Sequence, residues 1–170
     1  MERECRARLV ILKAFFRYWL PILVWMTLIF IGSSDVLSAE HTSRFIEPLL
    51  RWLRPGISPA TIAKVHLLVR KAGHVSEYAV LAVLVYRALV HTLLAGRAFA
   101  SAALVLATCA LYAASDEFHQ SFVPSRTASP RDVMIDISGA FLAVCLYAVF
   151  GIGRTATNEA AVSSPGPERI

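Results

Sequence analysis

The stretch that decides the fold runs from residue 99 to residue 114 and reads FASAALVLATCALYAA. It contains no charged side chain, as expected for a segment that crosses a membrane as a helix. Directly after it come two carboxylates, an imidazole and an amide, in the order Asp116-Glu117-Phe118-His119-Gln120. Polar side chains at the end of an apolar run cost free energy at a lipid boundary, so these residues need a structural or functional reason.

The rest of the chain has the same block-like distribution of apolar residues. Of its 170 residues 56% are hydrophobic, its formal net charge is +5, and its mean hydropathy is +0.58. Soluble domains of this size rarely have such a composition. Only helices and closed barrels satisfy every backbone polar group in lipid, and the chain lacks the alternating pattern of a barrel strand. The sequence therefore predicts an all-α, polytopic membrane protein that is a bundle of four transmembrane helices.

Four segments have the apolar length of a span, namely 15–32, 72–90, 98–115 and 133–152. An amphipathic helix in the headgroup plane is predicted at 43–53, between the first two spans. Three regions follow from this division: a basic cytoplasmic N-terminus at 1–14, a four-helix transmembrane domain at 15–152, and a disordered tail at 153–170. A cleavable signal peptide is the alternative for the first apolar run, since Leu37-Ser38-Ala39 is a weak cleavage site.

Local signals mark several helix ends. Ser58-Pro59 and Ser129-Pro130 both have the pattern of an N-cap followed by proline at the first helical position. Gly96 permits a tight bend between the second and third spans. Cys109 and Cys145 lie inside apolar runs and are expected to act as small packing residues.

The short link at 91–97 makes the second and third spans an antiparallel hairpin. The start of the second span, at 70–77, must then lie on the same membrane side as the end of the third, at 116–120. The start of the fourth span, at 132–136, returns to that side. Three polar groups that are distant in sequence are therefore expected to meet at one membrane face.

The candidate binding cluster consists of the ionisable and amide side chains at these positions. Its members are Arg70, Lys71, His74, Glu77, Asp116, Glu117, His119, Gln120, Arg126, Asp132 and Asp136. If the site is catalytic, the candidates are Glu77, Asp116, Glu117 and His119. Arginine suits bidentate contacts to phosphate, so an anionic lipid headgroup is the expected ligand class.

Simpler explanations exist for the same residues. Glu77 fits an ion pair with Arg70 or Lys71 at a helix end, and Asp132 fits the positive end of the helix dipole. Residues 116–120 fit a solvated helix end. Carboxylates sit badly at a helix C-terminus, however, so Arg126 or Arg131 is expected as a local partner. The chain has no HExxH or CxxC spacing, so neither a metal nor a cofactor is predicted.

Four blocks of the sequence together have a familiar pattern. They are Phe30-Ile31-Gly32-Ser33-Ser34, the run from Arg70 to Tyr78, the run from Ser115 to Arg126, and Asp132 to Asp136 with Gly139-Ala140. They resemble the VanZ-like family of bacterial membrane proteins over about residues 30–139. The resemblance implies a multi-pass protein of the bacterial plasma membrane. The namesake of the family is linked to low-level resistance to the glycopeptide teicoplanin, and no reaction is generally assigned to the family.

Three hypotheses about function follow. The leading one is a non-enzymatic envelope protein that binds an anionic lipid-linked cell-wall intermediate through Arg126, Arg70 and Lys71. The first alternative is an enzyme acting on a lipid or phosphate-bearing substrate, with Asp116 or Glu117 as base beside His119. The second is a structural or assembly protein whose polar residues hold the bundle together.

Membrane orientation is predicted from charge. The basic residues before the first span favour a cytoplasmic N-terminus, and four spans return the C-terminus to the cytoplasm. The polar cluster would then face outward. Basic residues in the first connection and at the head of the second span argue the other way, and the oligomeric state is left open.

Overall fold

The computed structural model describes residues 1–34, 39–123 and 129–150. Every regular element in those ranges is helical, and four helices are long and apolar enough to cross a membrane. This confirms the predicted all-α architecture with four spans. The predicted tail at 153–170 and the weak cleavage site near Leu37 and Ser38 lie outside the described residues. In chain order the elements are α1 (Glu2–Ala14), a π-helical turn (Phe15–Trp19), α2 (Leu20–Ser33), α3 (Ala39–Leu53), α4 (Pro59–Thr92), α5 (Ala98–Gln120) and α6 (Pro130–Phe150).

The helices extend beyond the apolar runs that predicted them. α4 has 34 residues, which corresponds to about 51 Å at 1.5 Å per residue, against about 30 Å for the hydrocarbon core of a bilayer. Its first turns carry Lys64, Arg70 and Lys71 and still remain helical. An apolar run therefore marks the part of a helix that fits lipid, while capping residues mark its ends.

The first span continues a helix that begins at Glu2, well before the predicted start at residue 15. A π-helical turn at Phe15–Trp19 joins α1 to α2. Pro21 provides the physical reason, because it has no N–H for the carbonyl of Arg17 and its ring crowds that carbonyl. One wider turn just before the proline accommodates the missing hydrogen bond without ending the helix.

The predicted caps and bend are confirmed. Ser58 is the N-cap of α4, and its Oγ accepts a hydrogen bond from the Thr61 N–H at 3.2 Å. Gly96 has φ of +75°, a left-handed conformation that glycine adopts without steric cost. α6 begins at Pro130, and the Ser129 Oγ accepts from the Arg131 N–H at 3.3 Å.

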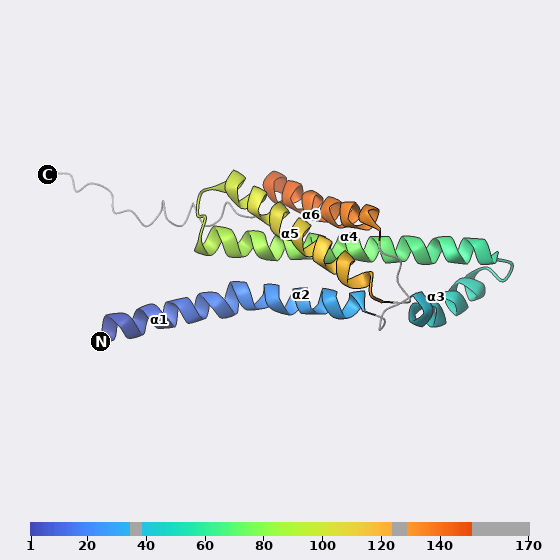
Figure 1. Ribbon diagram of the computed structural model, residues 1–170, viewed down its shortest axis with the longest axis horizontal. Helices are drawn as coiled ribbons and strands as arrows, with labels where there is room; N and C mark the ends of the chain where they lie inside the picture. The colour runs from blue at the N-terminus through green and yellow to red at the C-terminus, as the bar shows by residue number, and fades with distance from the viewer. Residues whose placement is uncertain (35–38, 124–128, 151–170) are drawn as a thin grey trace.

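α4 is the central helix of the bundle, and α6 packs along it most closely (Figure 1). Gly139 of α6 makes this approach possible, since a Cβ placed there would lie 2.9 Å from the Val75 Cα. The small buried residues Ala140 and Ala143 follow on the same helix. The predicted stripe of small residues on the fourth span is therefore a helix-packing surface.

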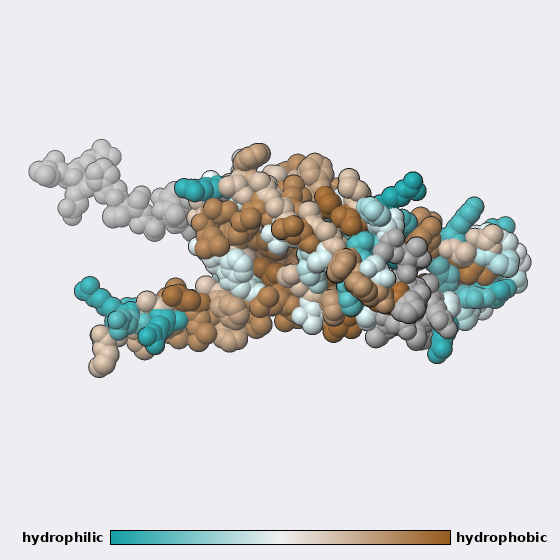
Figure 2. Space-filling view, viewed as in Figure 1, coloured by the Kyte–Doolittle hydropathy of each residue, from teal (hydrophilic) through white to brown (hydrophobic). Residues whose placement is uncertain are grey.

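The ends of the bundle are polar and its middle is apolar (Figure 2). α1 begins at one end of the molecule, and α6 runs toward that end and stops well short of it (Figure 1). The ends of α2 and α5 and the start of α6 lie toward the other, where α4 projects further and packs against α3 (Figure 1). A helix thus occupies the segment predicted as amphipathic, and its location in the headgroup plane stays a prediction.

Candidate functional site

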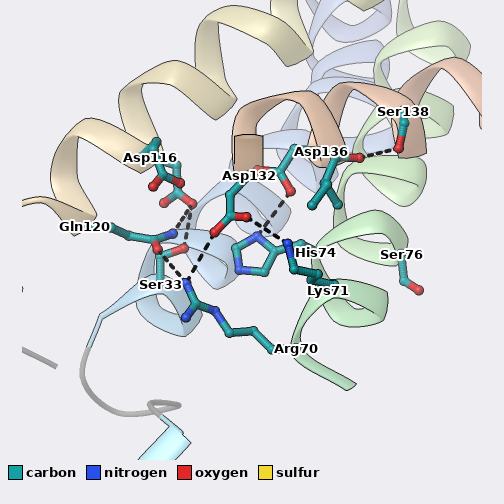
Figure 3. Close-up of polar contacts among 12 residues, drawn as sticks. Ser33, Arg70, Lys71, His74, Ser76, Asp116, Gln120, Asp132, Asp136 and Ser138 are labelled. Atoms are coloured by element: carbon teal, nitrogen blue, oxygen red, sulfur yellow. Dashed lines mark hydrogen bonds and ion pairs between the residues drawn. The ribbon is translucent and has the colours of Figure 1, made fainter. Parts of the chain in front are cut away.

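A chain of hydrogen bonds begins in a buried position at the end of α2 and crosses the bundle to a partly buried one (Figure 3). The Ser33 hydroxyl donates to Asp116 Oδ2 at 2.7 Å, and the Gln120 amide donates to the same oxygen at 3.0 Å. The Gln120 carbonyl oxygen accepts from the Arg70 guanidinium at 3.4 Å. Asp116 is 3% exposed and Gln120 is fully buried, so these contacts replace hydration that the side chains have lost.

Two cations of α4 share one carboxylate at the start of α6. Lys71 Nζ lies 3.2 Å from Asp132 Oδ1, and Arg70 Nη2 lies 3.8 Å from Asp132 Oδ2. All three side chains are partly exposed, so solvent weakens the pairing. One carboxylate neutralises only one of the two cations, and the pair retains a net positive charge.

A histidine–carboxylate pair lies deeper between the same two helices. His74 Nδ1 and Asp136 Oδ1 are 3.2 Å apart, and Asp136 is 1% exposed. The contact counts as an ion pair only when His74 is protonated, and its alignment is poorer than that of a hydrogen bond. It nevertheless gives the intramembrane carboxylate Asp136 a polar partner across the α4–α6 interface.

Glu117 ties the end of α5 to the start of α6. Its Oε1 accepts a hydrogen bond from the backbone N–H of Ser129, the residue before α6. The carboxylates of the third span were expected to pair with Arg126 or Arg131. Among the described residues, Asp116 and Glu117 accept hydrogen bonds from a hydroxyl, an amide and a backbone N–H. Arg126 lies outside the described residues.

Two further members of the predicted cluster are placed differently. The His119 ring stacks on Phe30 with 4.3 Å between ring centroids, so its described contact is aromatic. Glu77 is partly buried one turn after His74, and its backbone carbonyl accepts from the Trp25 indole at 2.9 Å. The arrangement brings Arg70, Lys71, His74, Asp116, Gln120, Asp132 and Asp136 together, as span parity predicts.

Three residues in or beside the network were not in the predicted cluster. Ser33 could have been found, because the same parity puts the end of the first span at this face. Ser129 was expected only as a cap, and no sequence pattern indicates that its backbone N–H donates to Glu117. Tyr78 is fully buried, and its Oη has no hydrogen-bond partner among the described residues. Its position four residues after His74 places it on the same side of α4.

The surface opening of this network is a cleft of about 370 Å³ between the first half of α4 and the start of α6. Three basic side chains line it, Arg70, Lys71 and Arg131, together with the carboxylates Asp132 and Asp136. Cations exceed carboxylates by one (three against two) even with His74 neutral. In the described ranges no three His, Cys, Asp or Glu side chains are arranged to hold a metal ion. The cleft therefore suits an anionic group better than a cation.

Comparison with known protein families identifies a match. A family model described as VanZ/LLP1 matches residues 18–151, which is most of the chain. The matched segment contains the whole network from Ser33 to Asp136. No curated protein and no solved structure matches the chain.

Proposed function

Because the chain belongs to the VanZ-like family of membrane proteins, we propose that it is a non-enzymatic protein of the bacterial cell envelope that binds a lipid-linked phosphate. The phosphate would occupy the cleft between α4 and α6. Such a protein would alter access to lipid-linked cell-wall intermediates and thereby susceptibility to glycopeptides such as teicoplanin.

The observation that carries the proposal is the shared carboxylate. Asp132 serves both Arg70 and Lys71 at 3.8 and 3.2 Å, and neither distance is short. An entering phosphate can therefore contact both the guanidinium and the ammonium group. One of these two cations would at the same time remain paired with Asp132. Charge-assisted contacts of this kind contribute about 1.5–3 kcal/mol each.

Orientation is part of the proposal. The basic side chains of α1, among them Arg3, Arg6 and Lys13, are exposed at the end of the bundle opposite the cleft. With these residues in the cytoplasm, the cleft opens to the outer face, where cell-wall intermediates are used. The N- and C-termini would both be cytoplasmic.

The test is binding of dodecyl phosphate by the protein in phosphatidylcholine nanodiscs, with dodecanol as the uncharged comparison. Arg70→Gln should weaken phosphate-dependent binding by about tenfold or more, because it removes one charge-assisted contact. Arg97→Gln is the matched control, since Arg97 is exposed in the turn before α5 at the opposite end. Equal binding of dodecyl phosphate and dodecanol by the wild-type protein would refute the proposal.

In cells, the expected result is a change in the teicoplanin inhibitory concentration on expression of the wild-type chain. Arg70→Gln at equal membrane abundance should abolish it, and Arg97→Gln should not.

A second candidate is an enzyme, favoured by the His74–Asp136 pair at the wall of the cleft. An imidazole held by a carboxylate is a common general base, and it lies beside the cations that would hold a phosphate. The readout is release of inorganic phosphate from dodecyl phosphate, which His74→Gln should abolish while binding persists. Without turnover by the wild-type protein, this candidate fails and the binding proposal stands.

A further inference from the structure

A second cavity, of about 560 Å³, lies between α3 and the first turns of α4. Its α4 side includes the apolar residues Ile62, Ala63 and Leu67, which recur on one face of the helix. Its α3 side includes Glu47 and Arg51, which form an ion pair at 2.8 Å. The volume lies within the range of about 300–1,000 Å³ that small-molecule sites occupy.

This cavity adjoins the phosphate cleft. Leu67 and Arg70 line both spaces, so one helical turn of α4 forms the boundary between them. The Arg70 guanidinium is held on the cleft side by Gln120 and Asp132. A molecule with its anionic group at Arg70 can therefore extend past Leu67 into the α3–α4 cavity.

The orientation of α3 leaves an apolar face turned away from the cavity. Glu47 and Arg51 line the cavity with side chains that are 41% and 49% exposed. Leu49, Trp52 and Leu53 do not line it and are 55%, 78% and 65% exposed. Two residues along a helix correspond to a rotation of about 200°, so Leu49 lies opposite Glu47. The outer face of α3 is thus apolar and suited to contact hydrocarbon, from which a lipid chain can enter.

The cavity wall also contains a polar atom without a partner. His66 Nε2 is buried and has no hydrogen-bond partner among the described residues. His66 lies four residues before Arg70 and is therefore one turn away on the same side of α4. An oxygen near the head of an amphiphile, next to its phosphate, could pair with this nitrogen.

We infer that the α3–α4 cavity holds the first segment of the hydrocarbon chain of a single-chain phosphate amphiphile whose phosphate lies in the cleft. This assignment rests on the proposed function and adds to it the class of ligand. The ligand is a phosphate ester of a long-chain alcohol, bound by both its charge and its chain. Free phosphate would occupy only the cleft and would bind more weakly.

The test uses an alkyl phosphate that carries a diazirine in its chain, added to the full-length protein in phosphatidylcholine nanodiscs. Photolysis followed by peptide mass spectrometry should locate adducts at Ile62, Ala63 and Leu67. Ala63→Trp fills the cavity and should abolish these adducts. Ala60→Trp places the same side chain one turn earlier, at an exposed position outside the cavity lining, and should leave them unchanged. Ala63→Leu, a milder change, should reduce them if the Trp variant does not fold.

The outcomes separate the two levels of the proposal. Adducts that depend on the phosphate but fall on exposed residues of the spans, such as Leu111 and Phe141, would overturn the chain assignment and leave the phosphate site intact. If Ala63→Trp and Ala63→Leu fold and keep the Ile62 and Leu67 adducts, the chain assignment is likewise overturned and the phosphate site is left intact. A labelling pattern identical for the alkyl phosphate and the corresponding diazirine alcohol would overturn the phosphate site itself, and the ligand class with it.

Discussion

Asp116 is a carboxylate with almost no exposure, in a helix long and apolar enough to cross a membrane. One of its oxygens accepts from both Ser33 and Gln120, while the other has no hydrogen-bond partner among the described residues. A buried polar group in lipid is stable only with such partners. Asp116 therefore connects α2 to α5 and, through Gln120, to Arg70 of α4.

Removal of Asp116 should cost more than removal of Ser33. Asp116→Ala leaves the Ser33 hydroxyl and the Gln120 amide without their acceptor, at about 1–3 kcal/mol for each stranded group. Ser33→Ala removes only one donor. The coupling energy between Ser33 and Asp116 in a double-mutant cycle should be about 0.6–1.7 kcal/mol, as for hydrogen bonds in other membrane helices. Thermal or denaturant unfolding in detergent measures both quantities.

Ser138→Ala is the control for this cycle. Ser138 is exposed on α6, and its hydroxyl donates to the Ile135 carbonyl of its own helix. Loss of the Ser138 hydroxyl should leave the free energy of unfolding nearly unchanged. Additive effects of Ser33→Ala and Asp116→Ala would contradict the bond between α2 and α5.

The residues of the site were largely predictable, but their pairing was not. Counting spans places the polar residues of 70–77, 116–120 and 132–136 at one face. Helical spacing suggests the Asp116–Gln120 contact, because the two are four residues apart. It says nothing of the rotation of one helix against another, which places Asp132 beside both Arg70 and Lys71. His119 likewise lies on the predicted membrane side of the cluster, yet its ring packs on Phe30.

The close packing of α4 on α6 depends on the absence of a Cβ atom at Gly139. A Cβ at Gly139 would lie 2.9 Å from both the Val75 Cα and carbonyl carbon, closer than real Cβ atoms approach. His74 and Asp136 lie within a turn of this contact, so the spacing of the two helices also sets their distance. The close approach is part of how the site is held.

Gly139→Ala should therefore destabilise the protein by about 1–3 kcal/mol, the usual cost of overpacking. Gly73→Ala should be neutral or stabilise by about 0.5–1 kcal/mol, because a Cβ there meets no atom within 4 Å and alanine favours the helix. The unfolding midpoint in detergent checks both. If the two variants shift it by the same amount and sign, the close contact does not limit stability.

Helix ends were predictable where capping residues mark them and unpredictable elsewhere. Ser58-Pro59 and Ser129-Pro130 identify the starts of α4 and α6, since serine and proline favour those positions energetically. The start at Glu2 has no such signal, and hydropathy predicts a span that begins only near residue 15. Hydropathy measures transfer into lipid, whereas a helix can continue through residues such as Arg6 and Arg8, which have good helix propensity in water.

The whole bundle has two unlike ends, and the chain carries a natural probe for one of them. Cys5 is exposed near the start of α1, and Cys109 is buried. Ser121, exposed after α5, lies at the end of the bundle that holds the network. The proposed orientation puts Cys5 inside and residue 121 outside.

A membrane-impermeant maleimide applied to intact cells should leave Cys5 of the wild-type chain unlabelled until the cells are permeabilised. Ser121→Cys in a Cys5→Ser background should be labelled without permeabilisation. Cys5→Ser alone gives the baseline from Cys109 and Cys145. The reverse pattern would place the cleft in the cytoplasm and remove extracellular cell-wall intermediates as its ligands.

The bond from Ser33 to Asp116 joins residues 83 positions apart, and this separation bears on biosynthesis. At about 5–20 residues per second, Asp116 leaves the ribosome about 4–17 s after Ser33. The first span must therefore enter the bilayer before its partners exist, which its carboxylate-free α2 segment permits. The three later spans bring Arg70, Asp116 and Asp132, and Arg70 meets Asp132 only when the last of them has arrived. The network thus closes last, and a truncated chain would expose unmatched charge that a membrane protease could recognise.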